Sequence, residues 1–240
     1  MSKAAFFGRK NYLDLLKKRV IGLKDNYRQN IALIADELKG KTSLIFNFME
    51  NFHDNRIIVI YMDTRPEPLA SFARRFIGIL LYNFLSNSGI PLEEDLDFLI
   101  RKSARYIPDT VEKIKSVLAH IAKRKTIGVF SELISLCEAL HAETGKSSVV
   151  VFDEFKNLEA LGVKGIYREW ARLLISKKNT MYIITSSAKS RAKAILAKDL
   201  ALLFGNFEVI NLEPFDVMTS CDFLRSRLAG MNIADRKSVV

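Results

Sequence analysis

Several features are scarce in this sequence of 240 residues, and each scarcity excludes a class of protein. The two cysteines, Cys137 and Cys221, lie far apart without metal-ligand spacing, so we expect free thiols in a reducing compartment. Five prolines and eleven glycines are too few for a long flexible linker. Charge interrupts every apolar run well before the roughly 20 residues of a membrane span, and residues 1–8 lack the pattern of a signal peptide. We therefore expect a soluble, cytoplasmic protein that does not act in a membrane.

Acidic residues are also in the minority. The chain has 37 lysines and arginines against 27 acidic residues, a net charge of +10. Such a surplus fits contact with nucleic acid, attraction of polyphosphate, or a lysine-rich solvated surface. The basic residues are spread along the chain and are not interleaved with aromatic residues in the way of single-strand binding surfaces. The charge alone leaves these three interpretations open.

Short apolar runs alternate with amphipathic stretches along the chain. Five runs are typical of buried strands and cover residues 31–34, 57–62, 148–152, 181–185 and 207–212. Residues 69–85 place apolar side chains at three-to-four spacing, which predicts a helix, and further helices are expected from Pro108 and over 130–140. This alternation predicts an α/β domain whose mostly parallel sheet is covered by helices.

A candidate phosphate-binding loop follows the first predicted strand. It comprises Ala35, Asp36, Glu37, Leu38, Lys39, Gly40, Lys41, Thr42 and Ser43. Such a loop turns its backbone N–H groups around the β-phosphate of a nucleotide, and Gly40 lets the backbone come close. Lys41 would reach the β- and γ-phosphates, Thr42 would offer its hydroxyl to Mg²⁺, and the next helix would direct its positive end at the phosphates. The alternative is a chance Gly-Lys-Thr at the start of a helix.

A second motif is an apolar strand that ends in two acidic residues, Asp153 and Glu154. In a phosphate-loop site this strand lies beside the first one, so that Asp153 can hold Mg²⁺ opposite Thr42, directly or through water. Glu154 is then placed to act as the catalytic base that polarises the attacking water. A strand ending in Asp-Glu is commonly structural when it stands alone. Together, the two motifs predict a site for Mg-ATP.

The opening of the chain, residues 6–16, resembles the Phe-x-Gly-Arg-x-x-Glu-Leu-x-x-Leu opening of archaeal-type P-loop ATPases in the STAND branch of AAA+. The origin-recognition initiator ATPases open in a similar way. The resemblance implies that adenine is held near Phe7, Gly8 and Arg9. Taken from the residues alone, Gly8 and Arg9 indicate only a turn that leads into a helix.

Two later segments extend this resemblance over residues 4–226. Residues 181–187 look like the family's fourth strand, which ends in a small polar sensor of the γ-phosphate, here Ser186 or Ser187. Residues 202–215 look like its Leu-x-Gly-Arg segment and fifth strand.

The fold that the resemblance implies is the three-layer sandwich of an AAA+-like P-loop NTPase, with a five-stranded sheet of order 5-1-4-3-2. It implies a P-loop core over residues 1–213, the beginning of a helical lid over residues 214–240, and a switch that depends on ATP occupancy. The family continues beyond this point into the rest of the lid and usually a winged-helix domain. The chain ends at Val240, inside the expected lid.

Three departures from the family pattern bear on activity. Ala35 replaces the first glycine of the loop, and its Cβ narrows the backbone choices there. Asp36 and Glu37 put carboxylates where the family has neutral or basic residues, and we expect both to weaken ATP binding. Asn206 stands where the family often has arginine, so a cation that would sense or complete a site is missing.

These observations give three hypotheses. The first is Mg-ATP binding with slow hydrolysis that drives a switch, slow because a cationic finger normally arrives from a protein partner or a second copy. The second is a nucleotide-binding scaffold that hydrolyses little, which the three departures favour. The third is an ATP-regulated, initiator-like DNA-binding protein, which the positive charge supports and the lack of a winged helix opposes.

Overall fold

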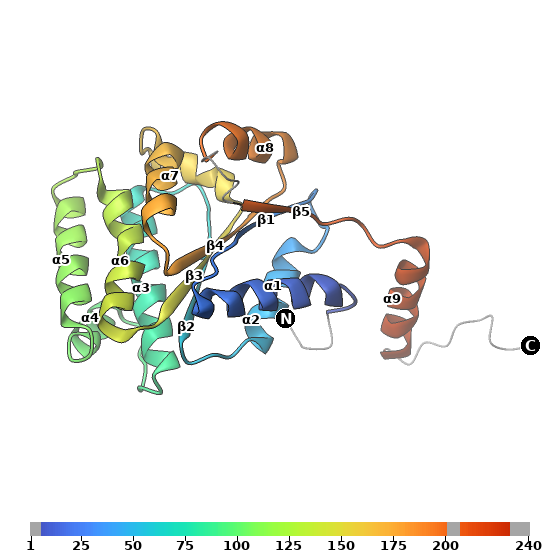
Figure 1. Cartoon of the computed structure of the whole chain (residues 1–240), viewed down its shortest axis with the longest axis horizontal. Coiled ribbons are helices and arrows are strands. Elements are labelled where there is room, and N and C mark those ends of the chain that lie inside the picture. The colour runs from blue at the N-terminus through green and yellow to red at the C-terminus, as the bar shows by residue number, and fades with distance from the viewer. Residues whose placement is uncertain (1–5, 201–206, 231–240) are drawn as a thin grey trace, which may run out of the picture.

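A computed structural model describes residues 6–200 and 207–230, and its centre is a five-stranded sheet (Figure 1). The strands are β1 (Asn30–Ile34), β2 (Ile57–Asp63), β3 (Ser147–Asp153), β4 (Thr180–Ser186) and β5 (Phe207–Asn211). All four pairings are parallel, and the order across the sheet is β2-β3-β4-β1-β5. Counted from the other edge this is 5-1-4-3-2, so the predicted sheet order is confirmed.

Helices cover both faces of the sheet and complete three layers. They are α1 (Lys10–Gly22), α2 (Lys41–Asn51), α3 (Leu69–Asn87), α4 (Leu96–Ser103), α5 (Pro108–Ala122), α6 (Val129–Thr144), α7 (Ile166–Ser176), α8 (Lys189–Lys198) and α9 (Val217–Gly230), with short 3-10 helices η2 (Leu23–Asp25) and η3 (Phe155–Leu161). Helices α1 and α2 pack on one face, and α3, α6, α7 and α8 pack on the other. The three predicted helices correspond to α3, α5 and α6, whereas the sequence did not indicate α4.

The central strands are buried on both faces, which explains their unbroken apolar runs. Because side chains alternate between the two faces of the sheet, the position of a residue along its strand fixes the face on which its side chain lies at the carboxyl end. Val151 of β3 faces α1 and α2, and two residues later Asp153 lies on that same side. Ile183 places Thr185 there in the same way, whereas Ser186 belongs to the opposite face. The alternation therefore brings polar groups from two strands to the start of α2.

Beyond β5 the chain leads to α9, which lies to one side of the layers (Figure 1). The assignment of residues 214–240 to a helical lid stays a prediction. The Leu-x-Gly-Arg-like segment, including Asn206, lies outside the described residues. Within the described part of the chain, the helices are all too short or too polar to cross a membrane.

Candidate functional site

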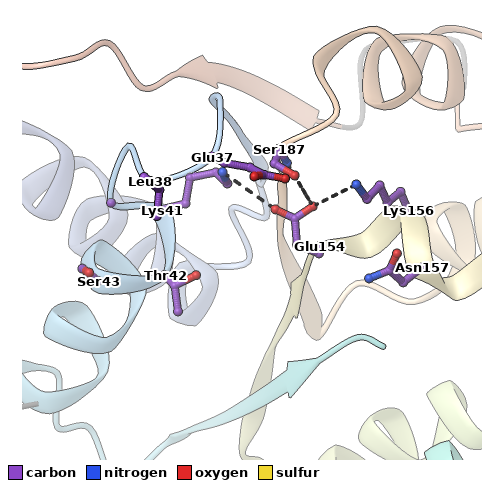
Figure 2. Close-up of a pocket in the computed structure, with 10 residues that line it drawn as sticks. Glu37, Leu38, Lys41, Thr42, Ser43, Glu154, Lys156, Asn157 and Ser187 are labelled. Atoms are coloured by element: carbon purple, nitrogen blue, oxygen red, sulfur yellow. Dashed lines mark hydrogen bonds and ion pairs between the residues drawn. The ribbon is translucent and has the colours of Figure 1, made fainter. Parts of the chain in front are cut away.

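A pocket of about 610 Å³ lies where the carboxyl ends of β1, β3 and β4 meet the start of α2 (Figure 2). Three segments line it: the loop after β1, the segment after β3, and the first residue beyond β4. The lining residues are Glu37, Leu38, Gly40, Lys41, Thr42, Ser43, Glu154, Lys156, Asn157 and Ser187. The structure thus brings together the two sequence motifs, which are more than 100 residues apart.

The loop after β1 has the backbone geometry of an anion-binding turn. Gly40 precedes α2 with a φ of 83°, and Leu38 also has a positive φ, of 60°. A Cβ at Gly40 would meet only the Arg9 Nε at 4.0 Å, so the left-handed backbone, and not crowding, favours glycine here. No side chain caps the start of α2. The first backbone N–H groups of the helix therefore remain available to bind an anion in the pocket.

Lys41 is buried at the start of α2, with 6% of its side chain exposed. Its Nζ donates to the backbone oxygens of Ala35 and Asp36, each at 3.0 Å, and lies 3.8 Å from Glu154 Oε1. Ala35 is itself fixed, because its N–H donates to the Ser186 oxygen at 3.2 Å. The ammonium group is therefore positioned at the mouth of the loop by the loop's own carbonyl groups.

The two acidic side chains of the loop lie differently. The Asp36 carboxylate pairs with Lys189 of α8 at 2.8 Å, is 61% exposed, and does not line the pocket. The hydrogen bond from Lys189 lowers the pKa of Asp36. Glu37, in contrast, is exposed and lines the pocket. Both carboxylates were expected to weaken ATP binding; Glu37 lies where it could oppose a ligand in the pocket, whereas the Asp36 carboxylate is directed toward α8.

Asp153 is buried at the end of β3 and accepts three hydroxyl groups. Thr42 Oγ1 donates to its Oδ2 at 2.8 Å, Tyr61 of β2 donates to the same oxygen at 2.7 Å, and Thr185 Oγ1 donates to Oδ1. Burial and the neighbouring Asp153 carboxylate raise the pKa of the Tyr61 hydroxyl, so Tyr61 remains a donor. Tyr61 and Thr185 were not predicted from the sequence, although the positions of both follow from the two-residue alternation once the strands are paired.

The pair Thr42 and Asp153 suits a magnesium ion. A hydroxyl oxygen and a carboxylate oxygen lie side by side, and Mg²⁺ prefers oxygen ligands from one or two protein groups together with phosphate and water. Among residues 6–200 and 207–230, no three His, Cys, Asp or Glu side chains cluster as a metal cage would require. The donor set therefore fits an ion that arrives with a phosphate ligand.

Glu154 follows β3 in a left-handed conformation, with φ 52° and ψ 50°. Its Oε2 accepts from the backbone N–H and the hydroxyl of Ser187, each at 3.0 Å. Its backbone N–H donates to Thr185 Oγ1 at 3.0 Å, which links it to the Asp153 network. The carboxylate thus points into the pocket and is tied to the segment after β4.

The two predicted sensor residues take different positions. Ser187 lines the pocket and contacts Glu154. Ser186 is buried, and its Oγ accepts from the Ala188 N–H at 3.2 Å. Only Ser187 is therefore placed to contact a ligand in the pocket.

A second pocket, of about 420 Å³, adjoins the first and shares Leu38, Gly40 and Ser43 with it. Aromatic and apolar side chains from both ends of the chain dominate its lining. The lining residues are Phe6, Phe7, Arg9, Leu38, Lys39, Gly40, Ser43, Pro214, Phe215, Ser220 and Phe223. An apolar pocket beside a polar one is the shape that a base linked to phosphates requires.

Arg9 joins the parts of this second pocket. Its Nη2 donates to the backbone oxygens of Lys39 and Glu213, each at 3.0 Å, and its guanidinium group lies 4.7 Å from the centre of the Phe215 ring. A Cβ at Gly8 would come within 3.4 Å of that ring, and the φ of Gly8 is 65°. The predicted Phe7, Gly8 and Arg9 segment is therefore in contact with the loop and with the segment before α9.

Comparison with known proteins finds similar solved structures, but no protein family and no curated protein matches this chain. The solved structure of Cdc6p from Pyrobaculum aerophilum is similar, with TM-score 0.50 and 13% identity, over 92% of this chain and 49% of that one. The Orc1 protein of Aeropyrum pernix, solved in complex with DNA, is similar with TM-score 0.53 and 12% identity, over 94% of this chain and 50% of that one.

This chain therefore spans about half the length of these structures. At such low identity the similarity establishes the fold alone, the α/β fold that this chain shares with these two proteins.

Proposed function

We propose that this chain binds Mg-ATP across the two adjoining pockets, and that ATP occupancy drives a conformational switch. One observation carries the proposal: Lys41, Thr42 and Asp153 converge on a polar pocket whose wall is shared with an aromatic one. The opening residues 6–16 further support placement in the STAND branch of AAA+.

Each part of the nucleotide has protein groups that match it. The N–H groups at the start of α2 and the Lys41 ammonium would bind the β- and γ-phosphates, with Lys41 exchanging carbonyl oxygens for phosphate oxygens. Thr42 and Asp153 would hold Mg²⁺, which supplies positive charge to neutralise the phosphates. The aromatic pocket beside Arg9 would take the adenine ring.

Hydrolysis belongs to this proposal as a slow step. Glu154 would act as the base, but its carboxylate would first have to release contacts with Lys41 and Ser187 in order to orient water. Rapid turnover would also need a cationic residue from a protein partner or a second copy. A scaffold that binds nucleotide and hydrolyses little remains the alternative.

Titration with a fluorescent ATP analogue, with and without Mg²⁺, tests the central claim. We expect saturable binding that tightens when Mg²⁺ is present, because Thr42 and Asp153 can then reach the phosphates through the ion. Absence of binding under both conditions would refute the proposal, provided that thermal unfolding shows a folded protein.

Replacement of Glu37 by glutamine is expected to tighten ATP binding by about fivefold. The carboxylate lines the pocket, and a partly screened like charge near a triphosphate opposes binding by roughly 1 kcal/mol. The matched variant Asp36→Asn should change affinity by less than about twofold, since Asp36 is directed to Lys189. Calorimetry at fixed ionic strength measures both, and equal effects of the two variants would contradict this distinction.

A specific observation favours contact with nucleic acid as a second function. Residues 155–200, which include η3, α7 and α8, contain ten lysines and arginines against three acidic residues. This segment therefore carries a net charge of +7 out of the +10 of the whole chain. The exposed members include Arg168 and Arg172 of α7 and Lys193 and Lys198 of α8. Arg168 Nε lies 3.5 Å from the Asp199 carboxylate, just after α8.

We propose that this α7–α8 surface binds the phosphate backbone of DNA, as a polyanion favours concentrated positive charge. The Orc1 protein of similar fold was solved in complex with DNA, which adds support. The variant Lys193→Glu/Lys198→Glu should weaken duplex binding roughly tenfold in fluorescence anisotropy and lower the salt dependence by about two phosphate contacts. Lys113→Glu/Lys115→Glu, the same charge change on exposed residues of α5, is the control. Equal losses in both variants would mean that only net charge matters.

A further inference from the structure

Lys156 is a second lysine in the phosphate pocket, and the proposed function gives it no role. It lies on η3, two residues after the proposed base, and about a third of its side chain is exposed. Its Nζ is 3.8 Å from Glu154 Oε2, while Lys41 Nζ is 3.8 Å from Oε1 of the same carboxylate. Figure 2 shows the two lysines approaching Glu154 from opposite sides. One anion is thus held between two cations inside the pocket.

The backbone beneath Lys156 is fixed, whereas its side chain is not. Phe155 and Leu158 on either side are fully buried in the core. The Tyr167 hydroxyl contacts the backbone oxygens of Phe155 and Lys156, each at 3.1 Å. Asn157 Nδ2 donates to the Thr64 oxygen at 2.8 Å. The turn therefore fixes the backbone of Lys156 at the edge of the pocket, while its ammonium group extends toward Glu154.

An anion that lies between two ammonium groups indicates where another anion can bind. The Glu154 carboxylate has two oxygens and one negative charge, and a terminal phosphate offers three oxygens and more charge. Both lysines lie 3.8 Å from the carboxylate, too far for a hydrogen bond, and the side chains of Lys156 and Glu154 are 32% and 27% exposed, so a phosphate can replace the carboxylate at little cost. The contacts of Glu154 Oε2 with the Ser187 N–H and hydroxyl involve neither lysine.

We propose that Lys156 binds the γ-phosphate of the nucleotide and thereby lets this site distinguish a nucleoside triphosphate from a diphosphate. The inference rests on the proposed function. Lys41 lies on the loop side of Glu154 and would contact the β- and γ-phosphates. Lys156 lies on the opposite side of Glu154 and would contact the γ-phosphate alone. The chain thereby supplies from within one cation that would otherwise come from a neighbour.

The test compares ATP and ADP affinities, by calorimetry with Mg²⁺, in the parent and in Lys156→Met. Loss of one charge-assisted contact is expected to weaken ATP binding about tenfold, and ADP binding should change by less than about twofold. Lys156→Arg, which keeps the charge, should retain most of the preference for ATP. Lys115→Met, at an exposed lysine of α5 outside the pocket, should leave both affinities unchanged.

Two results would overturn the inference. Equal losses of affinity for ATP and ADP would mean that Lys156 contacts a group that both nucleotides have. Unchanged affinities would mean that Lys156 only pairs with Glu154 and does not contact the nucleotide. A second variant separates these effects: in a Glu154→Gln background the loss of ATP preference on Lys156→Met should persist. Failure of the parent to bind either nucleotide would instead refute the proposed function, and the titration of the parent detects that case first.

Discussion

Replacing Lys41 by alanine is expected to weaken Mg-ATP binding by about 100-fold or more. The Lys41 ammonium group lies at the loop, where it donates to two backbone oxygens, and charge-assisted hydrogen bonds contribute about 1.5–3 kcal/mol each. The fold should survive, because the partners of Lys41 are two loop carbonyl groups that water can reach once the side chain is gone.

Calorimetry with Mg-ATP measures this loss, and thermal unfolding of the same samples verifies the fold. Lys18→Ala, which removes an exposed lysine of α1, is the matched control and should bind as the parent does. A Lys41→Ala protein that binds Mg-ATP normally would show that the loop after β1 is not the phosphate site.

Replacing Glu154 by glutamine is expected to lower ATP turnover by on the order of 10² or more while ATP stays bound. Glutamine keeps the shape of the side chain and an oxygen that can accept from Ser187, but it cannot take a proton from water. The change also removes the carboxylate that pairs with Lys41 and Lys156, which frees both cations for phosphate. The variant should therefore bind ATP at least as tightly as the parent.

Phosphate release under single-turnover conditions, alongside calorimetry, separates these two effects. Glu159→Gln, at an exposed glutamate of η3 that pairs with Arg191, controls for the loss of a nearby charge. Unchanged turnover in Glu154→Gln would place the base elsewhere or reveal contaminating activity. No phosphate release from the parent would make the nucleotide-binding scaffold the correct description.

The sequence predicted the parts of the site that lie in local motifs. The loop before α2 and the Asp153-Glu154 pair are readable because a strand-loop-helix and a strand with an acidic end are each continuous segments. The sheet order came only through the family resemblance, since the apolar runs contain no information about which strands are neighbours.

The parts that the sequence did not predict depend on the pairing of distant segments. Thr185 and Tyr61 reach Asp153 only because β4 and β2 both flank β3. Asp36 was expected to oppose phosphate, but Lys189, 153 residues away, takes its carboxylate. Such contacts follow from the tertiary fold and leave no signal in a local window of residues.

The two thiols of this chain differ in exposure and reactivity, and this difference allows a spectroscopic probe to be attached to α9 alone. Cys137 is buried in α6, and burial raises the pKa of its thiol to about 12, so it hardly reacts at neutral pH. Cys221 is exposed on α9, two residues before Phe223, whose ring lies 5.6 Å from that of Phe7. A maleimide dye will therefore label the unaltered protein at one position. Its emission would follow any displacement of α9 in real time as ATP is added.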